Sequence, residues 1–398
     1  MRVLIPLALI CLLIGALDAQ TYRTQTEVTA LTASPPSDYA PTLPGDMLEI
    51  YWSSARTGGV GRNDIWKCTR TGLDQPWGTP TNETLLNTTG DEYYINIRSD
   101  GLEMIISTNR NTGGTGYIND LYSSTRTSTS APWGTPTIIT ELNSTSAADT
   151  EDDPTMTADG LEIFFTSDRS GGQAAAIWTS TRKDFNSPWS APTLVAEIDT
   201  SSYEHSAAIS GDGLTLIFSS NRPGGTGSSD HYLVTRKDRN SKFGTPVELK
   251  EINSTRWDHN GTQTDDGFSF YFTYDQQNKI YRADRILPAC WPPNGNPKVG
   301  QVFDIYVRRD IGDRVGVIIG SLASIPPTPI PPLIGTLEVH LGLMVWYGTG
   351  AIDKEGKYTS HIPIPNLPPL RGIDLYFQGA VQNPTAIYLS NLCKVTIE

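Results

Sequence analysis

Side chains that could carry chemistry recur at regular intervals in the first two thirds of the chain. A carboxylate returns every 53 to 59 residues, at Asp38, Glu92, Glu151, Glu204 and Asp258. The residue after each one is aromatic, acidic or a histidine: Tyr39, Tyr93, Asp152, His205 and His259. Carboxylates and imidazoles serve as metal ligands and as general acids or bases. A place where these ten residues meet could therefore bind a ligand.

Two interpretations of this set stay open. Arginines recur with the carboxylates, and carboxylate–guanidinium pairs could simply hold the repeats together; they are Arg56, Arg110, Arg169 and Arg222. Alternatively, the residues that break the symmetry mark function. Asp152, His205 and His259 could bind a divalent cation, or an acid and a base could flank a sugar. Glu151-Asp152-Asp153 lacks EF-hand spacing and favours a solvated turn. No catalytic residue is assigned.

These positions lie within a repeated set of β-elements. Five segments carry an Asp-Gly-type turn followed by an apolar strand, and they align on Leu48, Leu102, Leu161, Leu214 and Phe268. A Gly-rich loop and an aromatic residue with an arginine four positions later follow the strand. Four units then show a turn like Pro-Trp-Gly-Thr-Pro and an amphipathic strand, such as 194–198 or 247–252. Asp-Gly between apolar runs indicates a hairpin, and the period suits a four-stranded blade.

The two ends of the repeat region complement each other. The fifth unit stops after Arg285 without its outer strand, and residues 27–31 resemble the missing one. We therefore predict an all-β fold with a five-bladed β-propeller at residues 20–286, closed by an N-terminal strand. A solenoid is the structural alternative, but a strand supplied from the other end favours a closed ring.

The units resemble the TolB-type, WD-like propeller repeat of exported bacterial proteins. The resemblance is carried by the run from Ser210-Gly211-Asp212-Gly213-Leu214 through Ser219-Ser220-Asn221-Arg222-Pro223-Gly224-Gly225. Unit five departs from it, because Tyr274-Asp275 replaces the Asn-Arg pair. The resemblance implies the fold, but such propellers include scaffolds, binding modules and enzyme domains.

The N-terminus indicates export. Residues 1–19 read as a signal peptide, with a positive start, an apolar run from Val3 to Leu17 and cleavage after Ala19. The run is short for a membrane span, although an N-terminal anchor is the alternative. Export favours a disulfide, and Cys290–Cys393 would tie the C-terminal segment together. Cys68 is expected to be a small buried residue.

The last third of the chain has a different pattern. Residues 287–297 form a Pro-rich linker, and 298–398 alternate prolines with strand-like runs at 302–307, 315–319, 373–378 and 386–390. This predicts a small β-sandwich. The stretch from Ile362 to Gln378 is similar to sandwich domains at the C-termini of large exported bacterial proteins, a resemblance that assigns no active residue.

Charge and organisation together limit the function. A net charge of −13 argues against nucleic acid and anionic membranes as partners. We expect a secreted, periplasmic or cell-surface monomer without a membrane span. Its expected role is to bind a protein or glycan at a propeller face or at the mouth of the central channel. The alternative is a carbohydrate-active or metal-dependent hydrolase or lyase with its site in that channel.

Overall fold

The computed structural model describes residues 22, 25–33, 37–73, 75–112, 118–169, 175–265, 267–273 and 278–285. Farther along the chain it describes the backbone of the strands between residues 289 and 396. The predicted signal peptide at 1–19 lies outside these residues. No helix within the described part is long and apolar enough to cross a membrane.

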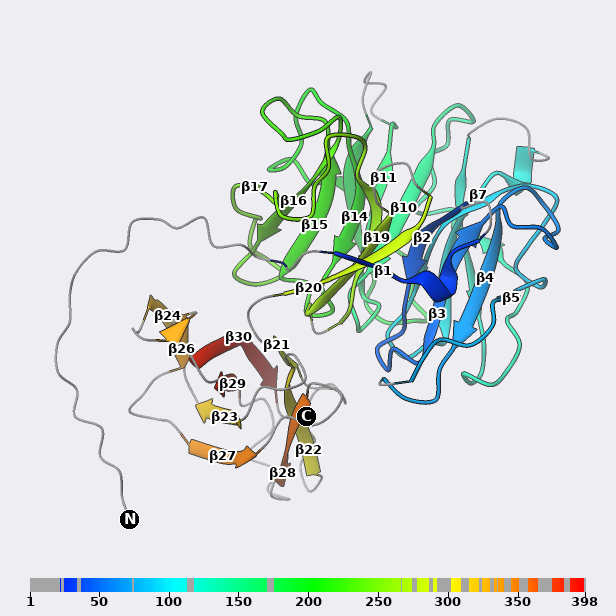
Figure 1. The fold of residues 1–398 in the computed structure, drawn as a ribbon. Coiled ribbons are helices and arrows are strands. Elements are labelled where there is room, and N and C mark those ends of the chain that lie inside the picture. The colour runs from blue at the N-terminus through cyan, green and yellow to red at the C-terminus, as the bar shows by residue number, and fades with distance from the viewer. Residues whose placement is uncertain are drawn as a thin grey trace, which may run out of the picture.

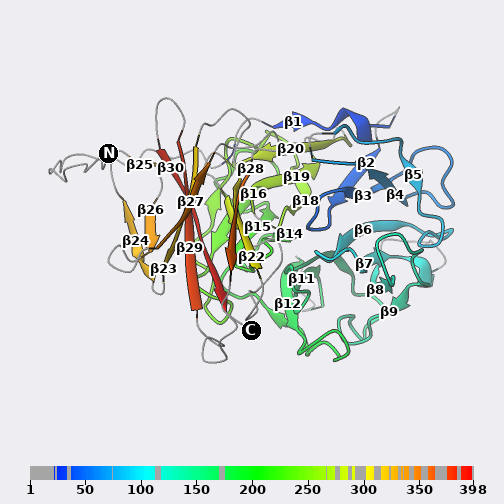
Figure 2. The same ribbon diagram turned by 90° about the horizontal axis from the view of Figure 1, so that it is seen from below.

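Five antiparallel sheets of four strands form a ring, as predicted for a five-bladed propeller (Figures 1 and 2). Each repeat supplies the three inner strands of one blade and, in four blades, also the outer strand. Blade 1 contains β2 (Asp38–Thr42), β3 (Glu49–Ser54), β4 (Asp64–Thr69) and β5 (Thr81–Asn82); blade 2 contains β6 (Glu92–Ile97), β7 (Glu103–Thr108), β8 (Asp120–Thr125) and β9 (Thr137–Ile138).

The remaining blades continue the same order around the ring. Blade 3 contains β10 (Glu151–Met156), β11 (Glu162–Ser167), β12 (Ala176–Thr181) and β13 (Thr193–Leu194); blade 4 contains β14 (Glu204–Ile209), β15 (Thr215–Ser220), β16 (Asp230–Thr235) and β17 (Val247–Glu248). Blade 5 contains β18 (His259–Gln263), β19 (Ser269–Thr273) and β20 (Ile280–Asp284), and its fourth strand is β1 (Thr26–Glu27) from the other end of the repeat region. This confirms closure by the N-terminal strand.

The outer strands are shorter than predicted. Only Thr193–Leu194 and Val247–Glu248 pair as strands, and the following residues turn. Within these turns, Ile198 N donates to Val195 O at 3.2 Å and so places the Ile198 side chain in the core. The N-terminal segment repeats the arrangement, because β1 leads into a short 3₁₀ helix, η1 (Thr29–Leu31), that buries Leu31. A second 3₁₀ turn, η2 (Arg110–Thr112), follows β7.

Five hydrophobic clusters fill the five spaces between neighbouring blades. The second strand of every blade is apolar on both faces, so its side chains pack on two neighbours at once. Representative pairs across the five spaces are Tyr51 with Ile106, Ile105 with Phe165, Phe164 with Phe218, Ile217 with Phe272, and Trp52 with Tyr271. Cys68 belongs to the cluster between blades 5 and 1, and it is buried and unpaired as predicted.

The C-terminal strands form sheets of their own. β21 (Ala289–Trp291), β22 (Val302–Arg308) and β28 (Lys357–Pro363) form one; β25 (Leu333–Ile334), β30 (Ile387–Thr396), β29 (Asp374–Gln382), β23 (Val315–Ser321) and β27 (Val345–Gly350) form another; β24 (Ser324–Pro329) pairs with β26 (Thr336–Val339). β21 lies inside the stretch predicted as a linker. The side chains here lie outside the described residues, so the sandwich packing and the Cys290–Cys393 disulfide stay predictions.

Candidate functional site

The repeated carboxylates are structural ties inside the blades. In four blades the carboxylate at the start of the innermost strand pairs with the arginine after the second strand of the same blade. The pairs are Asp38–Arg56 at 2.5 Å, Glu92–Arg110 at 3.2 Å, Glu151–Arg169 at 3.0 Å and Glu204–Arg222 at 3.3 Å. All four carboxylates are buried. In blade 5, Asp258 Oδ2 instead accepts from Ser254 N at 2.5 Å.

The residues at the second position of the predicted set lie beside the channel lining and are not part of it. Tyr39 and Tyr93 bond at their hydroxyls to Asn63 and, at 3.0 Å, to Asp91. His205 is buried, with its Nε2 3.1 Å from Ser229 Oγ, and the pKa of His259 is lowered because it is buried. Among the described residues, Asp152, His205 and His259 do not form a group that could hold a metal ion.

A β-bulge in each innermost strand explains why the register differs from the expected one. Pairing with the second strand shifts just after these positions in four blades and at Tyr93 itself in blade 2. In four blades the bulged residue has a positive φ near 50°, namely Ala40, Asp153, Ser206 and Asn260. Such a bulge re-aims the following side chains. The residues that reach the axis are therefore those two and three places after the repeated carboxylate.

The channel cavity is small and lined by one pair of residues from each blade. Its lining comprises Ala40 and Pro41, Tyr94 and Ile95, Asp153 and Pro154, Ser206 and Ala207, and Asn260 and Gly261. The volume is about 20 Å³, which is room for about one water molecule. Asp153 is the one carboxylate among the described residues of this lining. The expected solvated turn at Glu151-Asp152-Asp153 is wrong, because these residues begin β10.

A hydrogen-bonded chain crosses three blades along this lining. Ser206 N and Thr166 Oγ1 donate to Asp153 Oδ2 at 3.1 and 3.2 Å, and Ser206 Oγ donates to Asn260 Oδ1 at 3.1 Å. His205 Nδ1 lies 2.9 Å from Ser206 Oγ. Because that hydroxyl proton goes to Asn260, His205 donates from Nδ1 and its Nε2 accepts from Ser229. Burial lowers the pKa of His205 well below its ordinary value and keeps this ring neutral.

Asp152 and Asp153, the two adjacent carboxyls in blade 3, have raised pKa values. Burial raises the pKa of Asp152 to about 6 and that of Asp153 to about 7, and the charge of Asp152 adds to the second shift. Burial, followed by the charges of these two carboxyls, also raises the pKa of Tyr94 and Tyr203. Perturbed titration concentrated at a channel is typical of a functional site.

Aromatic rings border the same end of the channel. His205 stacks on Trp257 with centroids 5.4 Å apart, and Tyr203 lies 4.7 Å from His205 and 6.3 Å from Trp257. Tyr203, Trp257 and Tyr94 are half-buried. We call these three rings, with Asp152 and Asp153, the channel mouth. It lies at the Gly-loop end of the blades, where the Gly58-Gly59 and Gly224-Gly225 loops join second to third strands.

Hydrogen bonds join neighbouring blades around the axis at the opposite end, where the Asp-Gly turns lie. Gly45 N donates to Ser99 O at 2.8 Å, Ala158 N to Gly211 O at 2.9 Å and Gly211 N to Asp265 O at 3.2 Å. Ser99 Oγ also bonds to Asp265 Oδ2. A Cβ at Gly211 would lie 2.8 Å from Asp265 O, so the close approach requires glycine. These contacts tie the blades together at this end of the channel.

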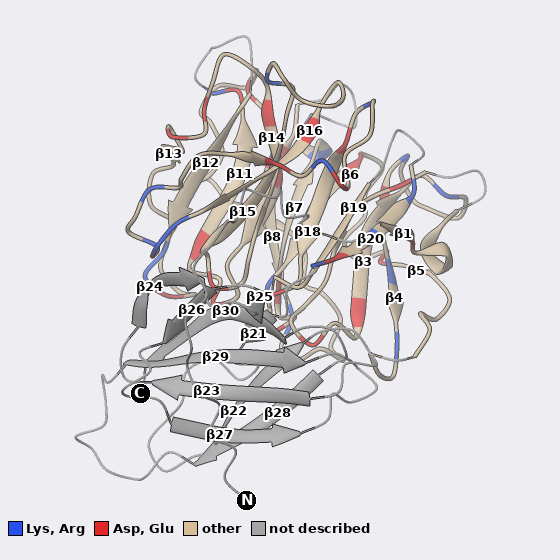
Figure 3. Cartoon of the chain, turned by 60° about the vertical axis from the view of Figure 1, so that its left-hand side comes forward, with Lys and Arg blue, Asp and Glu red and all other residues tan. Residues whose placement is uncertain are grey.

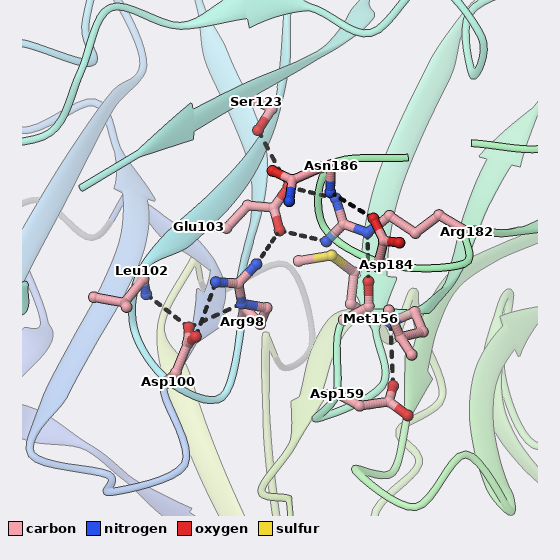
Figure 4. Close-up of polar contacts among 12 residues, drawn as sticks. Arg98, Asp100, Leu102, Glu103, Ser123, Met156, Asp159, Arg182, Asp184 and Asn186 are labelled. Atoms are coloured by element: carbon pink, nitrogen blue, oxygen red, sulfur yellow. Dashed lines mark hydrogen bonds and ion pairs between the residues drawn. The ribbon is translucent and has the colours of Figure 1, made fainter. Parts of the chain in front are cut away.

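Arginines tie neighbouring blades together near the Asp-Gly end. Glu103 of blade 2 lies between Arg98 of its own blade, at 2.7 Å, and Arg182 of blade 3, whose Nη1 is 3.0 Å away (Figure 4). The equivalent Arg126–Glu49 and Arg236–Glu162 pairs are 2.5 Å long. Figure 3 shows the two acidic sets at opposite ends of the blades, in red at the starts of β14 and β3. We call the pairs Arg126–Glu49, Arg182–Glu103 and Arg236–Glu162 the inter-blade clasps.

Comparisons with known proteins give only distant similarities. No protein-family model and no curated protein matches the chain. A thermostable family-43 glycoside hydrolase is 10% identical, with 66% of this chain and 92% of that chain covered and a TM-score of 0.42. The Bacteroides ovatus xyloglucan PUL GH43B is also 10% identical, with 93% of this chain and 92% of that chain covered and a TM-score of 0.43. The Cps50 (Swd1) β-propeller domain of Myceliophteria thermophila is 7% identical, with 62% of this chain and 83% of that chain covered and a TM-score of 0.33. Values this low support no inference about function.

Proposed function

We propose that this protein is an exported binding module that recognises a carbohydrate at the channel mouth. The supporting observation is the mixture of groups there. Tyr94, Tyr203 and Trp257 offer half-buried aromatic faces, and Asp152 and Asp153 offer carboxylate oxygens beside them. Aromatic rings suit the apolar faces of a sugar ring, and carboxylates accept hydrogen bonds from its hydroxyls. The segment 1–19 supports export.

The size of the channel favours binding at its mouth over binding within it. A cavity of about 20 Å³ is far smaller than the several hundred Å³ typical of sites that enclose a small molecule. A sugar ring would therefore rest on the channel mouth. Only a water molecule or one substituent would reach Asp153.

Calorimetric titration of the full-length mature protein with a panel of oligosaccharides tests this proposal. Tyr203→Ala and Trp257→Ala should each weaken binding about tenfold or more, as expected for the loss of one stacking ring. Phe185→Ala is the matched control, because Phe185 is an exposed aromatic residue near the Asp-Gly end. Equal effects of all three substitutions, or no binding by any oligosaccharide, would contradict the proposal.

Cleavage of a glycan by a hydrolase or lyase reaction is the second candidate, and the raised pKa of Asp153 favours it. A carboxyl whose pKa is about 7 holds a proton near neutral pH and could act as a general acid, with Asp152 as its partner. Release of reducing ends from polysaccharides by wild type, together with a loss of about 100-fold or more in Asp153→Asn, would support it. Binding without any release would leave the protein as a binding module.

A further inference from the structure

Asp152 and Asp153 lie beside the repeated carboxylates but lack the arginine partners that those have in blades 1 to 4. The four repeated carboxylates each pair with an arginine, whereas no lysine or arginine of the described residues pairs with Asp152 or Asp153. We propose that the ligand supplies the missing charge: the channel mouth binds an amino sugar through its protonated amine. This inference rests on the proposed carbohydrate-binding function and narrows it.

The hydrogen bonds of the two carboxyls leave acceptors available. Asp152 Oδ1 accepts from Ser107 Oγ at 2.5 Å and from Asn119 Nδ2 at 2.9 Å, and Asp153 Oδ2 accepts from Ser206 N and Thr166 Oγ1. An ionised carboxyl can accept about four hydrogen bonds, so both keep capacity for a further donor. An ammonium group carries three donors and no acceptor, so it complements such a set.

Asn119 gives an independent indication that a donor is missing. Its side chain lies against Asp152 and is 2% exposed, yet its Oδ1 has no hydrogen-bond partner among the described residues. A buried acceptor without a donor is costly, and it adds a negative dipole to the two carboxyls. An unsatisfied buried oxygen therefore lies beside the Asp152 carboxyl, and no lysine or arginine of the described residues pairs with this carboxyl or with Asp153.

The surrounding rings fit a cation and cannot supply one. Tyr94 and Tyr203 lie within the field of both carboxyls, and aromatic faces attract an ammonium group. His205, the titratable ring behind Ser206, is kept neutral by burial. An amine on a sugar would thus meet carboxylates on one side while its ring rests on an aromatic face.

Two hexasaccharides that differ only at nitrogen test the inference on the unmodified protein. The glucosamine hexamer should bind about tenfold or more tightly than the N-acetylglucosamine hexamer at low ionic strength, since a hydrogen bond between two charged groups is stronger than one between neutral groups. Added salt should reduce this preference. Asp152→Asn and Asp153→Asn should abolish it, whereas Asp199→Asn, an exposed carboxylate in the same blade, should preserve it.

The outcomes separate this inference from the function on which it rests. Equal binding of both hexamers would overturn the amine inference and leave carbohydrate binding intact. Binding of hexalysine without binding of either sugar would show that the amine belongs to a peptide and would overturn both. A preference for the glucosamine hexamer that survives in both Asp→Asn variants would also overturn the assignment to Asp152 and Asp153.

Discussion

At the scale of single residues, the backbone at the bulge decides which side chains meet at the axis. Asp153, Ser206 and Asn260 have φ near 50°, a left-handed conformation that Asp and Asn tolerate better than most residues. Such a conformation costs about 1–3 kcal/mol and persists only where its surroundings hold it. Here the Asp153–Ser206–Asn260 hydrogen bonds supply that support.

Asp153 should make stability depend on pH in a sense opposite to that of an ordinary paired carboxylate. Its folded-state pKa is about 7, whereas an unfolded carboxyl titrates near 4. Between these values the folded state holds a proton that the unfolded chain has lost, so stability falls as the pH rises. Asp153→Asn should therefore be more stable than wild type at about pH 8, by about 1 kcal/mol or more, and similar to it at about pH 4.

Urea unfolding at both pH values measures this difference, with Asp199→Asn as the control. That variant removes one exposed carboxylate from blade 3 and should follow the wild-type curve at both values. A constant difference between Asp153→Asn and wild type would mean that Asp153 does not titrate in this range.

At the scale of elements, the inter-blade clasps are distributed unevenly. They join blade 1 to 2, 2 to 3 and 3 to 4 through Glu49, Glu103 and Glu162. The same position carries Thr215 in blade 4 and Ser269 in blade 5, and neither can form an ion pair. The two interfaces of blade 5 therefore depend on apolar packing, on hydrogen bonds such as that from Ser206 Oγ to Asn260 Oδ1, and on ring closure.

Loss of a clasp should cost far more than the same truncation at an interface without one. Glu103→Ala leaves the buried guanidinium groups of Arg98 and Arg182 without their shared carboxylate, which should cost about 3 kcal/mol. Thr215→Ala, at the equivalent position of blade 4, should cost about 0.5 kcal/mol or less. Thermal and urea unfolding of both variants measure the difference. Similar losses would mean that the clasps contribute nothing specific.

At the scale of the whole molecule, the repeat made the propeller predictable and hid the site. Period, Asp-Gly turns and the unpaired end of unit five fix the number of blades and their closure. The carboxylates and arginines repeat because each blade needs them, and they proved structural. The residues that line the channel share no type, from Ala40 and Tyr94 to Asp153.

Simple strand alternation also cannot foresee the bulge that shifts the register. The acidic triplet at 151–153, which is unlike the other four blades, contains Asp153 of the cavity lining. The short outer strands escaped prediction for a related reason: their apolar residues continue into turns that bury Ile198 and Ile252. A hydrophobic pattern predicts which side chains are buried. It does not distinguish a strand from a turn, because either can bury a side chain.

Closure of the ring gives the last prediction. Val28 N donates to Ile280 O at 2.8 Å and fixes β1 on blade 5, and Glu83 N donates to Ile65 O at 3.0 Å and fixes β5 on blade 1. Val28→Pro and Glu83→Pro each remove one such bond, worth about 1 kcal/mol. The chain leads directly from β4 into β5, whereas β1 comes to blade 5 from the other end of the repeat region. Weakening the attachment of β1 should therefore loosen the closure of the ring.

Hydrogen exchange should therefore accelerate across β18, β19 and β20 in Val28→Pro, in the blade that lacks clasps on both sides. In Glu83→Pro it should accelerate only along β4 and β5, while the inner strands of blade 1 keep their protection. Glu83→Pro also removes the 2.9 Å ion pair between Lys67 and Glu83, so a wider effect of Val28→Pro would be due to ring closure. Equal, local effects in the two variants would mean that the interfaces of blade 5 hold the ring without β1.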